Sequence, residues 1–197
     1  MTLKQELKNQ LDEKILFMDG AMGTMIQQYH LEENDFRSER FKNHPIDLKG
    51  NNDLLSITRP EVIKEIHLAY LNAGSNIIET NTFNSTSISQ RDYQLEDLSD
   101  EINFASAQIA RRAAEEFKKN NPEKNVYVAG AIGPTNTTAS MSPDVNNPGF
   151  RNIDYDELKN SYYNQIAALH KGDIDLILIE TIFDTLNAKA AIHAAID

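Results

Sequence analysis

The chain has 197 residues, of which 40% are hydrophobic and 25% are charged, an ordinary composition for one globular domain or part of one. Its formal net charge of -11 argues against a nucleic-acid backbone or an anionic membrane surface as the main partner. The sequence contains no cysteine, so these residues offer no disulfide, no thiolate metal ligand and no cysteine nucleophile. Residues 1–14 are too charged for a signal sequence, and no apolar segment approaches the roughly 20 residues of a membrane helix, so we expect a cytoplasmic protein.

The helical spacing of apolar residues predicts five helices. They cover residues 3–13, 58–73, about 98–119, 154–171 and a segment that begins after Asp184. The second helix has the clearest ends, because Thr58 and Glu61 bracket Pro60 in a capping-box arrangement and Gly74 follows the last apolar residue. Residues 30–50 show no period and are longer than most connections, which suggests a functional excursion.

Five short apolar runs alternate with these helices and are interpreted as strands. They lie at residues 15–18, 54–55, 77–78, 126–132 and 176–179. The last three have no polar alternation, which is typical of parallel strands covered on both faces. No dinucleotide or Walker phosphate loop follows the first run, which favours a barrel over a doubly wound sheet. A (β/α)8 barrel needs eight strands and about 250 residues. We therefore expect residues 1–197 to be a truncated TIM-type barrel domain with about the first five βα units, and we doubt that it folds alone.

Three acidic residues follow alternate strands of this predicted barrel. Asp19, Glu79 and Glu180 lie at or near the ends of the first, third and fifth runs, and side chains from alternate strands share a layer inside a barrel. Glu180 ends an apolar run, so its carboxylate needs a cation, a metal or backbone donors, and a ligand ammonium group would serve. Structural roles remain open: a tight turn at Asp19, a buried Lys or Arg partner for Glu180, and a purely structural position for Glu79, which lies deeper in its strand.

Two further features are weaker signals. Residues 130–135 place small residues at a strand end, which would let backbone N–H groups approach a ligand, although a plain turn explains them nearly as well. The histidines show no metal-ligand spacing; they lie at positions 30, 44, 67, 170 and 193.

Five ordered segments resemble the homocysteine-binding module of cobalamin-dependent methionine synthase. The segments are residues 19–24 (DGAMGT), 47–53 (DLKGNND), 79–83 (ETNTF), 130–135 (GAIGPT) and 180–185 (ETIFDT). Related homocysteine methyltransferases share a sparser version of this signature. The resemblance covers the chain from about Leu11 to its last residue.

The resemblance implies a (β/α) barrel in which zinc, held by three cysteines on later strands, binds the homocysteine sulfur as a thiolate. Methylcobalamin on another domain of a longer chain would donate the methyl group, and methyltetrahydrofolate, bound by a folate domain, would recharge it. The absence of cysteine here departs from that pattern and is read as truncation, with the zinc ligands beyond residue 197. Among the present residues, the resemblance assigns no catalytic group and no metal ligand. It implies substrate-binding roles for Asp19, Gly20, Asn81, Gly133 and Glu180.

Three alternatives stay open at this point. A glycosidase-like barrel could use Glu79 and Glu180 as acid and nucleophile, and the separation of the two carboxyl groups would decide this. The chain could instead be a non-catalytic half barrel that acts in assembly. It could also belong to another homocysteine S-methyltransferase.

Overall fold

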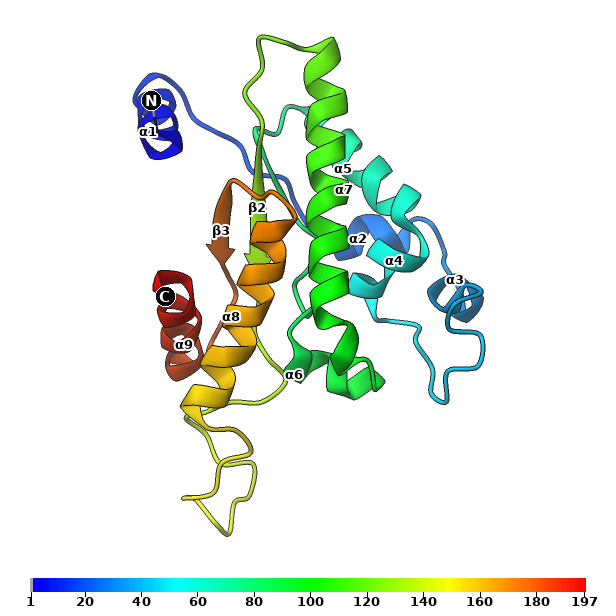
Figure 1. Ribbon diagram of the computed structural model, residues 1–197, viewed down its shortest axis with the longest axis vertical. Helices are drawn as coiled ribbons and strands as arrows, with labels where there is room; N and C mark the ends of the chain where they lie inside the picture. Colours follow the sequence, from blue (N-terminus) through cyan, green and yellow to red (C-terminus); the bar gives the residue numbers. More distant parts are fainter. Residues whose placement is uncertain (1) are drawn as a thin grey trace.

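A computed structural model describes residues 2–197 and contains a three-stranded parallel sheet with helices packed against it (Figure 1). The strands are β1 (Ile77–Glu79), β2 (Tyr127–Ile132) and β3 (Leu176–Ile179), in the order β1-β2-β3. Ile77 pairs with Tyr127, and Ala129 pairs with Leu176. Since all three strands run in the same direction, their carboxyl ends meet at one edge of the sheet.

The helices lie before, between and after these strands. They are α1 (Leu3–Glu13), α2 (Met22–Gln27), α3 (Glu33–Arg37), α4 (Leu55–Thr58), α5 (Pro60–Ala73), α6 (Ser87–Gln90), α7 (Ser99–Asn120), α8 (Tyr155–Lys171) and α9 (Thr185–Ile196), with short 3-10 turns at Asn52–Leu54, Arg91–Tyr93 and Glu96–Leu98. Helices α7 and α8 pack side by side and both contact β2 (Figure 1). The five helices expected from the sequence are confirmed, and α2, α3, α4 and α6 are additional.

Local chemistry explains most of the helix ends. Asp154 and Asp184 accept hydrogen bonds from backbone N–H groups in the first turns of α8 and α9, as N-cap carboxylates do. Gly74 ends α5 in the left-handed conformation, with φ 114°, where a side chain would be strained. The predicted capping box of α5 is wrong. Arg59 occupies the N-cap position, and the Thr58 hydroxyl donates to the carbonyl of Leu54, so Thr58 belongs to α4.

Two of the five expected strands differ in the structure. Residues 15–18 contribute an isolated parallel bridge from Met18 to Ile77. The second run is not a strand, because Leu54 and Leu55 lie in a 3-10 turn that continues into α4, where both side chains are fully buried. Two adjacent leucines after polar residues are compatible with a buried helical turn as well as with a short strand, so the sequence pattern does not distinguish the two. The described residues therefore contain three strands and one bridge instead of five βα units.

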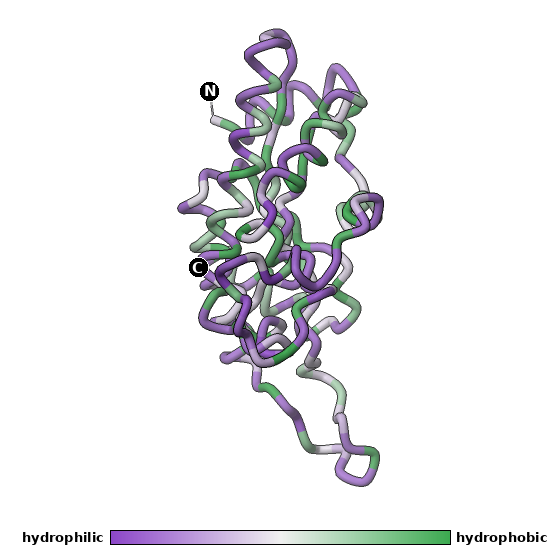
Figure 2. The backbone as a smooth tube through the Cα atoms, turned by 90° about the vertical axis from the view of Figure 1, so that its right-hand side faces the viewer, coloured by the Kyte–Doolittle hydropathy of each residue, from purple (hydrophilic) through white to green (hydrophobic). Residues whose placement is uncertain are grey.

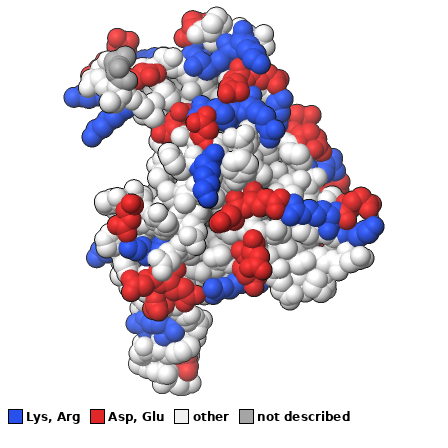
Figure 3. Space-filling model, viewed as in Figure 1, with Lys and Arg blue, Asp and Glu red and all other residues white. Residues whose placement is uncertain are grey.

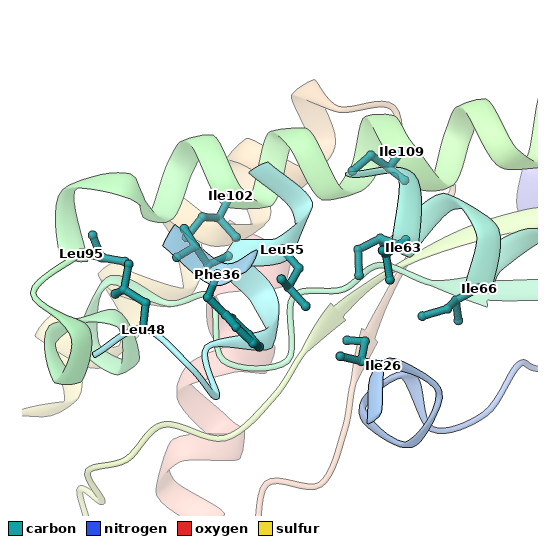
Figure 4. Close-up of a cluster of buried hydrophobic side chains, with 11 residues drawn as sticks. Ile26, Phe36, Leu48, Leu55, Ile63, Ile66, Leu95, Ile102 and Ile109 are labelled. Carbon is teal, nitrogen blue, oxygen red and sulfur yellow. The ribbon is translucent and has the colours of Figure 1, made fainter. Parts of the chain in front are cut away.

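The hydrophobic core divides into neighbouring clusters beneath the helices. One cluster joins α2, α3, α4, α5 and α7 (Figure 4), and its labelled members are Ile26, Phe36, Leu48, Leu55, Ile63, Ile66, Leu95, Ile102 and Ile109. A second lies between α8, α9 and the sheet, with Tyr162, Leu158 and Leu169 fully buried. The residues of 30–50 pack α3 onto the first cluster, so this segment has a structural role in addition to any other.

Two regions lie outside this core: a projecting loop and the outer part of the sheet. The segment between β2 and α8 projects from one end of the molecule and is largely hydrophilic (Figures 1 and 2). At the sheet, all four residues of β3 are half-buried, and Phe17 and Phe183 are exposed. Within residues 2–197, β3 pairs with β2 alone. No helix in this part of the chain is long and apolar enough to cross a membrane.

Candidate functional site

A pocket of about 400 Å³ opens at the carboxyl edge of the sheet. Its size falls within the range of about 300–1,000 Å³ that is typical of small-molecule sites. Three acidic side chains from separate parts of the chain meet in it: Asp19 after the Met18 bridge, Glu79 at the end of β1 and Glu180 directly after β3. The other lining residues are Gly20, Ala21, Met22, Gly23, Thr80, Asn81, Thr82, Phe83 and Ala131.

Asp19 is fixed by the backbone of the neighbouring strand. Its N–H donates to the carbonyl of Ile77 at 2.9 Å, and its two carboxylate oxygens accept from the Glu79 N–H at 3.1 and 3.0 Å. Burial raises the pKa of Asp19 to about 7; these backbone bonds oppose the shift, and the charge of Glu180 adds to it. The Asp19 carboxylate is therefore held in place at the pocket edge without a cation of its own.

Glu79 and Glu180 interact with each other inside the pocket. Burial, followed by the charges of Asp19 and Glu180, raises the pKa of Glu79 from 4.5 to about 8, which favours the protonated form at neutral pH with its proton directed to Glu180. Burial also raises the pKa of Glu180, while hydrogen bonds from Glu79 and Thr181 lower it. One proton shared between two close carboxyl groups relieves the repulsion between them.

The chain turns sharply after Glu180. The Glu180 N–H donates to the carbonyl of Ile132 at 3.0 Å, which extends the β2–β3 ladder by one residue. Thr181 then adopts φ 55°, a left-handed conformation that is unfavourable for a β-branched residue. Because the strand continues to Glu180 and bends directly after it, the carboxyl group sits at the rim of the pocket.

No lysine, arginine or histidine lines this pocket among the described residues. The nearby hydroxyl of Tyr70 is no substitute for a cation, since burial raises its pKa and the charges of Asp19 and Glu79 raise it further. In this part of the chain, no ion pair involves Asp19, Glu79 or Glu180. A group of carboxyl groups without an internal cation is suited to a ligand that brings a positive charge.

Gly20 and Asn81 line the pocket as the sequence led us to expect, but Gly133 is not among its lining residues. A Cβ atom on Gly133 would lie 2.2 Å from the carbonyl oxygen of Phe83, so the glycine lets the chain pass close behind the pocket wall. The Asn81 amide donates to the carbonyl of Asn52 at 2.8 Å and to the Ser56 hydroxyl at 3.2 Å. These bonds hold Asn81 to the 3-10 turn at Asn52–Leu54 and to α4.

Two threonines in the pocket wall were not identified from the sequence. Thr80 Oγ1 accepts from the N–H of Ala131 at 3.0 Å, and Thr82 Oγ1 donates to the carbonyl of the same residue at 2.8 Å. Their hydroxyl groups lie 2.6 Å apart. The side chains thus replace the backbone ladder where β1 leaves β2. The alternating Thr80-Asn81-Thr82 pattern directly after a strand was the available signal.

The side chains of residues 2–197 form no metal site. No cluster of three or more His, Cys, Asp or Glu side chains within residues 2–197 could hold a metal ion. The three pocket acids do not form such a cluster, and the sequence has no cysteine. The zinc site that the resemblance implies therefore does not fit this part of the chain, and we derive no chemical step through zinc.

The sequence matches the homocysteine S-methyltransferase family over residues 16–197. The chain belongs to this family. The matched range contains the three pocket acids. It also contains the Met18 bridge and the strands β1, β2 and β3.

Solved structures of a methyltransferase from Escherichia coli show the same fold. The chain is similar to the metallated form of the homocysteine methyltransferase MmuM, with 23% identity, a TM-score of 0.74 and coverage of 96% of this chain and 62% of that one. For the oxidized form of MmuM the identity is 23%, the TM-score 0.72 and the coverage 94% and 60%. The chain thus spans about three fifths of the length of these structures. This likeness supports a partial barrel.

Proposed function

We propose that this chain is the homocysteine-binding part of a cobalamin-dependent methionine synthase. The complete protein, meaning this chain with the remaining strands of the barrel, would transfer the methyl group of methylcobalamin to the sulfur of homocysteine and form methionine. 5-Methyltetrahydrofolate would then recharge the cobalamin. Family membership supports the substrate, and the five ordered motifs at residues 19–24, 47–53, 79–83, 130–135 and 180–185 support this member of the family.

The single observation that carries the proposal is the cation-free group of carboxyls at the carboxyl edge of the sheet. The ammonium group of homocysteine would bind to Asp19 and Glu180, and the Gly20 N–H would be available to its carboxylate. Glu79 keeps its proton and reduces the negative charge that the ligand must balance. Charge-assisted hydrogen bonds of this kind contribute about 1.5–3 kcal/mol each.

The remaining parts of the proposal lie outside the described pocket. Zinc ligands would come from beyond residue 197, and cobalamin and folate would be bound by other domains of the same longer chain. A cytoplasmic location also belongs to the proposal. The present residues would bind and orient the amino-acid end of the substrate, and the isolated chain would transfer no methyl group.

The glycosidase alternative is not supported. A retaining glycosidase needs its two carboxyl groups about 5–5.5 Å apart, and an inverting one needs a larger gap. The mutual pKa shifts of Glu79 and Glu180 indicate a pair that shares a proton, and the family match over residues 16–197 favours homocysteine over a sugar. A homocysteine S-methyltransferase with another methyl donor differs from the proposal in the donor alone, and activity without cobalamin would identify it.

Replacing Glu180 with glutamine in the complete protein tests the proposal. We expect Glu180→Gln to raise the homocysteine KM by about tenfold to a hundredfold, because one charge-assisted bond is worth about 1.5–3 kcal/mol. The measurement is steady-state methyl transfer with homocysteine varied, together with metal analysis, which should show unchanged metal content.

Two controls make this result specific. Glu157→Gln changes the same side chain on α8, where Glu157 pairs with Arg91 outside the pocket, and should leave KM unchanged. 4-Sulfanylbutanoate, which is homocysteine without its amino group, should bind wild type weakly and should be insensitive to Glu180→Gln. An unaltered homocysteine KM in Glu180→Gln would remove Glu180 from the site.

A further inference from the structure

The loop between β1 and α6 forms one wall of the pocket and is held from behind by a buried carboxylate. Asp53 is 3% exposed, and its Oδ2 accepts from the N–H of Asn84 at 2.9 Å. The N–H of Phe83 also donates to this carboxylate. Asp53 forms no ion pair with any residue in the described range 2–197. Its main partners are thus two successive backbone N–H groups of the pocket wall.

A pair of buried amides holds the other backbone polar group of Asn84, its carbonyl. Gln90 Nε2 donates to the carbonyl of Asn84 at 3.0 Å. Gln90 and Asn51 also exchange two hydrogen bonds, at 2.8 and 3.3 Å, and both side chains are buried. The N–H and the C=O of Asn84 are therefore both bound by side chains, from Asp53 and Gln90 respectively. Buried polar groups that are fully paired in this way fix one arrangement of a loop.

The wall also packs closely against the residue that follows β2. The carbonyl of Phe83 passes so close to Gly133 that a Cβ atom there would lie 2.2 Å from it, and Phe83 itself lines the pocket. Asn81, two residues earlier, is bound to the carbonyl of Asn52, the residue before Asp53. Residues 81–84 are thus clamped between the 51–53 segment and the end of β2.

We propose that Asp53 is a positioning residue for substrate binding, which holds Phe83 and Asn84 so that the wall fits the carbon chain of the bound amino acid. This inference rests on the proposed function, because it takes homocysteine as the occupant of the pocket. Burying a carboxylate without an ion-pair partner is unfavourable, and the backbone N–H groups of Phe83 and Asn84 are what offset that cost at Asp53. Burial also raises the pKa of Asp53 to about 7, opposed by the bonds from Asn84 and Phe83.

The experiment compares Asp53→Ala and Asp53→Asn with wild type in the complete protein. Asp53→Ala removes both acceptors and should raise the KM for homocysteine about tenfold. It should weaken binding of 4-sulfanylbutanoate by the same factor, since the wall would contact the carbon chain and not the ammonium group. Asp53→Asn keeps one acceptor oxygen and should restore most of the affinity. Amide hydrogen exchange at Asn84 should accelerate at least tenfold in Asp53→Ala.

Asp184 offers a matched control. It is 4% exposed, and its carboxylate also accepts from backbone N–H groups, at Leu186, Asn187 and Ser140, but it lies outside the pocket lining. Asp184→Ala should lower the melting temperature and leave both ligand affinities and Asn84 exchange unchanged. A rise in KM in Asp184→Ala equal to that in Asp53→Ala would overturn the positioning role, because loss of stability alone would then explain it.

The two proposals fail in different ways. If wild type binds homocysteine and Asp53→Ala binds it equally well, the role of Asp53 is overturned and the proposed function stands. If wild type binds no homocysteine, the proposed function is overturned and the role of Asp53 in substrate binding falls with it. Unchanged Asn84 exchange in folded Asp53→Ala would overturn the clamp itself.

Discussion

Acidic side chains occur in two opposite settings in this molecule, in the pocket and around α3. Around α3, Glu33 pairs with Arg37 at 2.5 Å and also accepts from the N–H groups of Leu48 and Lys49. Burial there would raise the pKa of Glu33, but these backbone bonds and Arg37 hold it below its usual value. In the pocket, Asp19 and Glu79 have no cation and their pKa values are raised. The arrangement around α3 stabilises the fold, whereas the pocket acids lack a cation that a positively charged ligand could supply.

Acidic side chains paired with basic ones, as around α3, are widespread on the surface. Basic and acidic side chains lie next to each other over the face carried by α5, α7 and α8 (Figure 3). Lys64 on α5 contacts Glu116 on α7, and Arg111 on α7 contacts Asp175 before β3. Removing a charge should therefore have opposite effects on stability in the two settings.

The largest effect is expected for Arg37→Ala. Besides Glu33, the guanidinium group donates to the carbonyls of Phe41, His44 and Ile46, and its side chain is 15% exposed. Losing these bonds leaves Glu33 without its cation and three carbonyls without their side-chain donor, and it should lower the free energy of unfolding by about 2–3 kcal/mol. Urea denaturation measures this change. A loss below 0.5 kcal/mol would show that the α3 setting does not stabilise the fold.

A smaller effect of opposite sign is expected for Glu79→Gln. The folded-state pKa of Glu79, about 8, lies above its ordinary value of 4.5, so the stabilisation is complete below pH 4.5 and is lost as the pH rises toward 8. Glutamine cannot ionise, so the variant should match wild type at pH 5. At pH 8 it should melt about 2–4 °C higher, after discounting for the partial exposure of the group.

Thermal melts of both proteins at pH 5, 6, 7 and 8 provide the measurement for Glu79→Gln. Glu61→Gln is the matched control, because Arg59 and other bonds lower the pKa of Glu61 despite its burial. This control should show no gain at pH 8. A constant difference between Glu79→Gln and wild type at all four pH values would contradict the shared proton in the pocket.

The smallest effect is expected for Lys42→Ala. Lys42 pairs with Glu39 at 3.1 Å, and both side chains are largely exposed, at 63% and 93%. Such a pair gains little in high dielectric and loses side-chain entropy, so its removal should change the free energy of unfolding by less than about 0.5 kcal/mol. A change as large as that of Arg37→Ala in the same urea experiment would mean that burial does not decide which ion pairs matter.

Much of the fold could be predicted from local sequence. Helix caps at Asp154 and Asp184, the glycine stop at Gly74 and the apolar runs of β2 and β3 depend on neighbouring residues, and all are present in the structure. The strand predicted at Leu54 and Leu55 is wrong, because two adjacent apolar residues are too few to show either a helical or a strand period. Their helical conformation depends on packing in the hydrophobic cluster with α5 and α7, and such tertiary contacts cannot be seen in the local sequence.

The part of the candidate site that could be predicted from the sequence is the group of acids whose positions follow from the topology of a parallel sheet. Asp19, Glu79 and Glu180 meet because each lies at, or directly after, the carboxyl end of a strand or bridge, and that rule can be applied to a sequence. Their substrate-binding roles stay a prediction. Asp53 and Gln90 could not be found in this way, because their partners are backbone groups 31 and 6 residues away in the chain. Backbone hydrogen bonds of this kind leave no residue-type signal at the partner position.

The outer edge of β3 has a practical consequence for handling the protein. Its backbone N–H and C=O groups on the side away from β2 face no strand within residues 2–197, and the neighbouring Phe183 is 69% exposed. Open strand edges next to apolar side chains promote intermolecular strand addition. Expressed by itself, this polypeptide should self-associate in proportion to its concentration, and a lysine placed on β3 should keep it in solution longer.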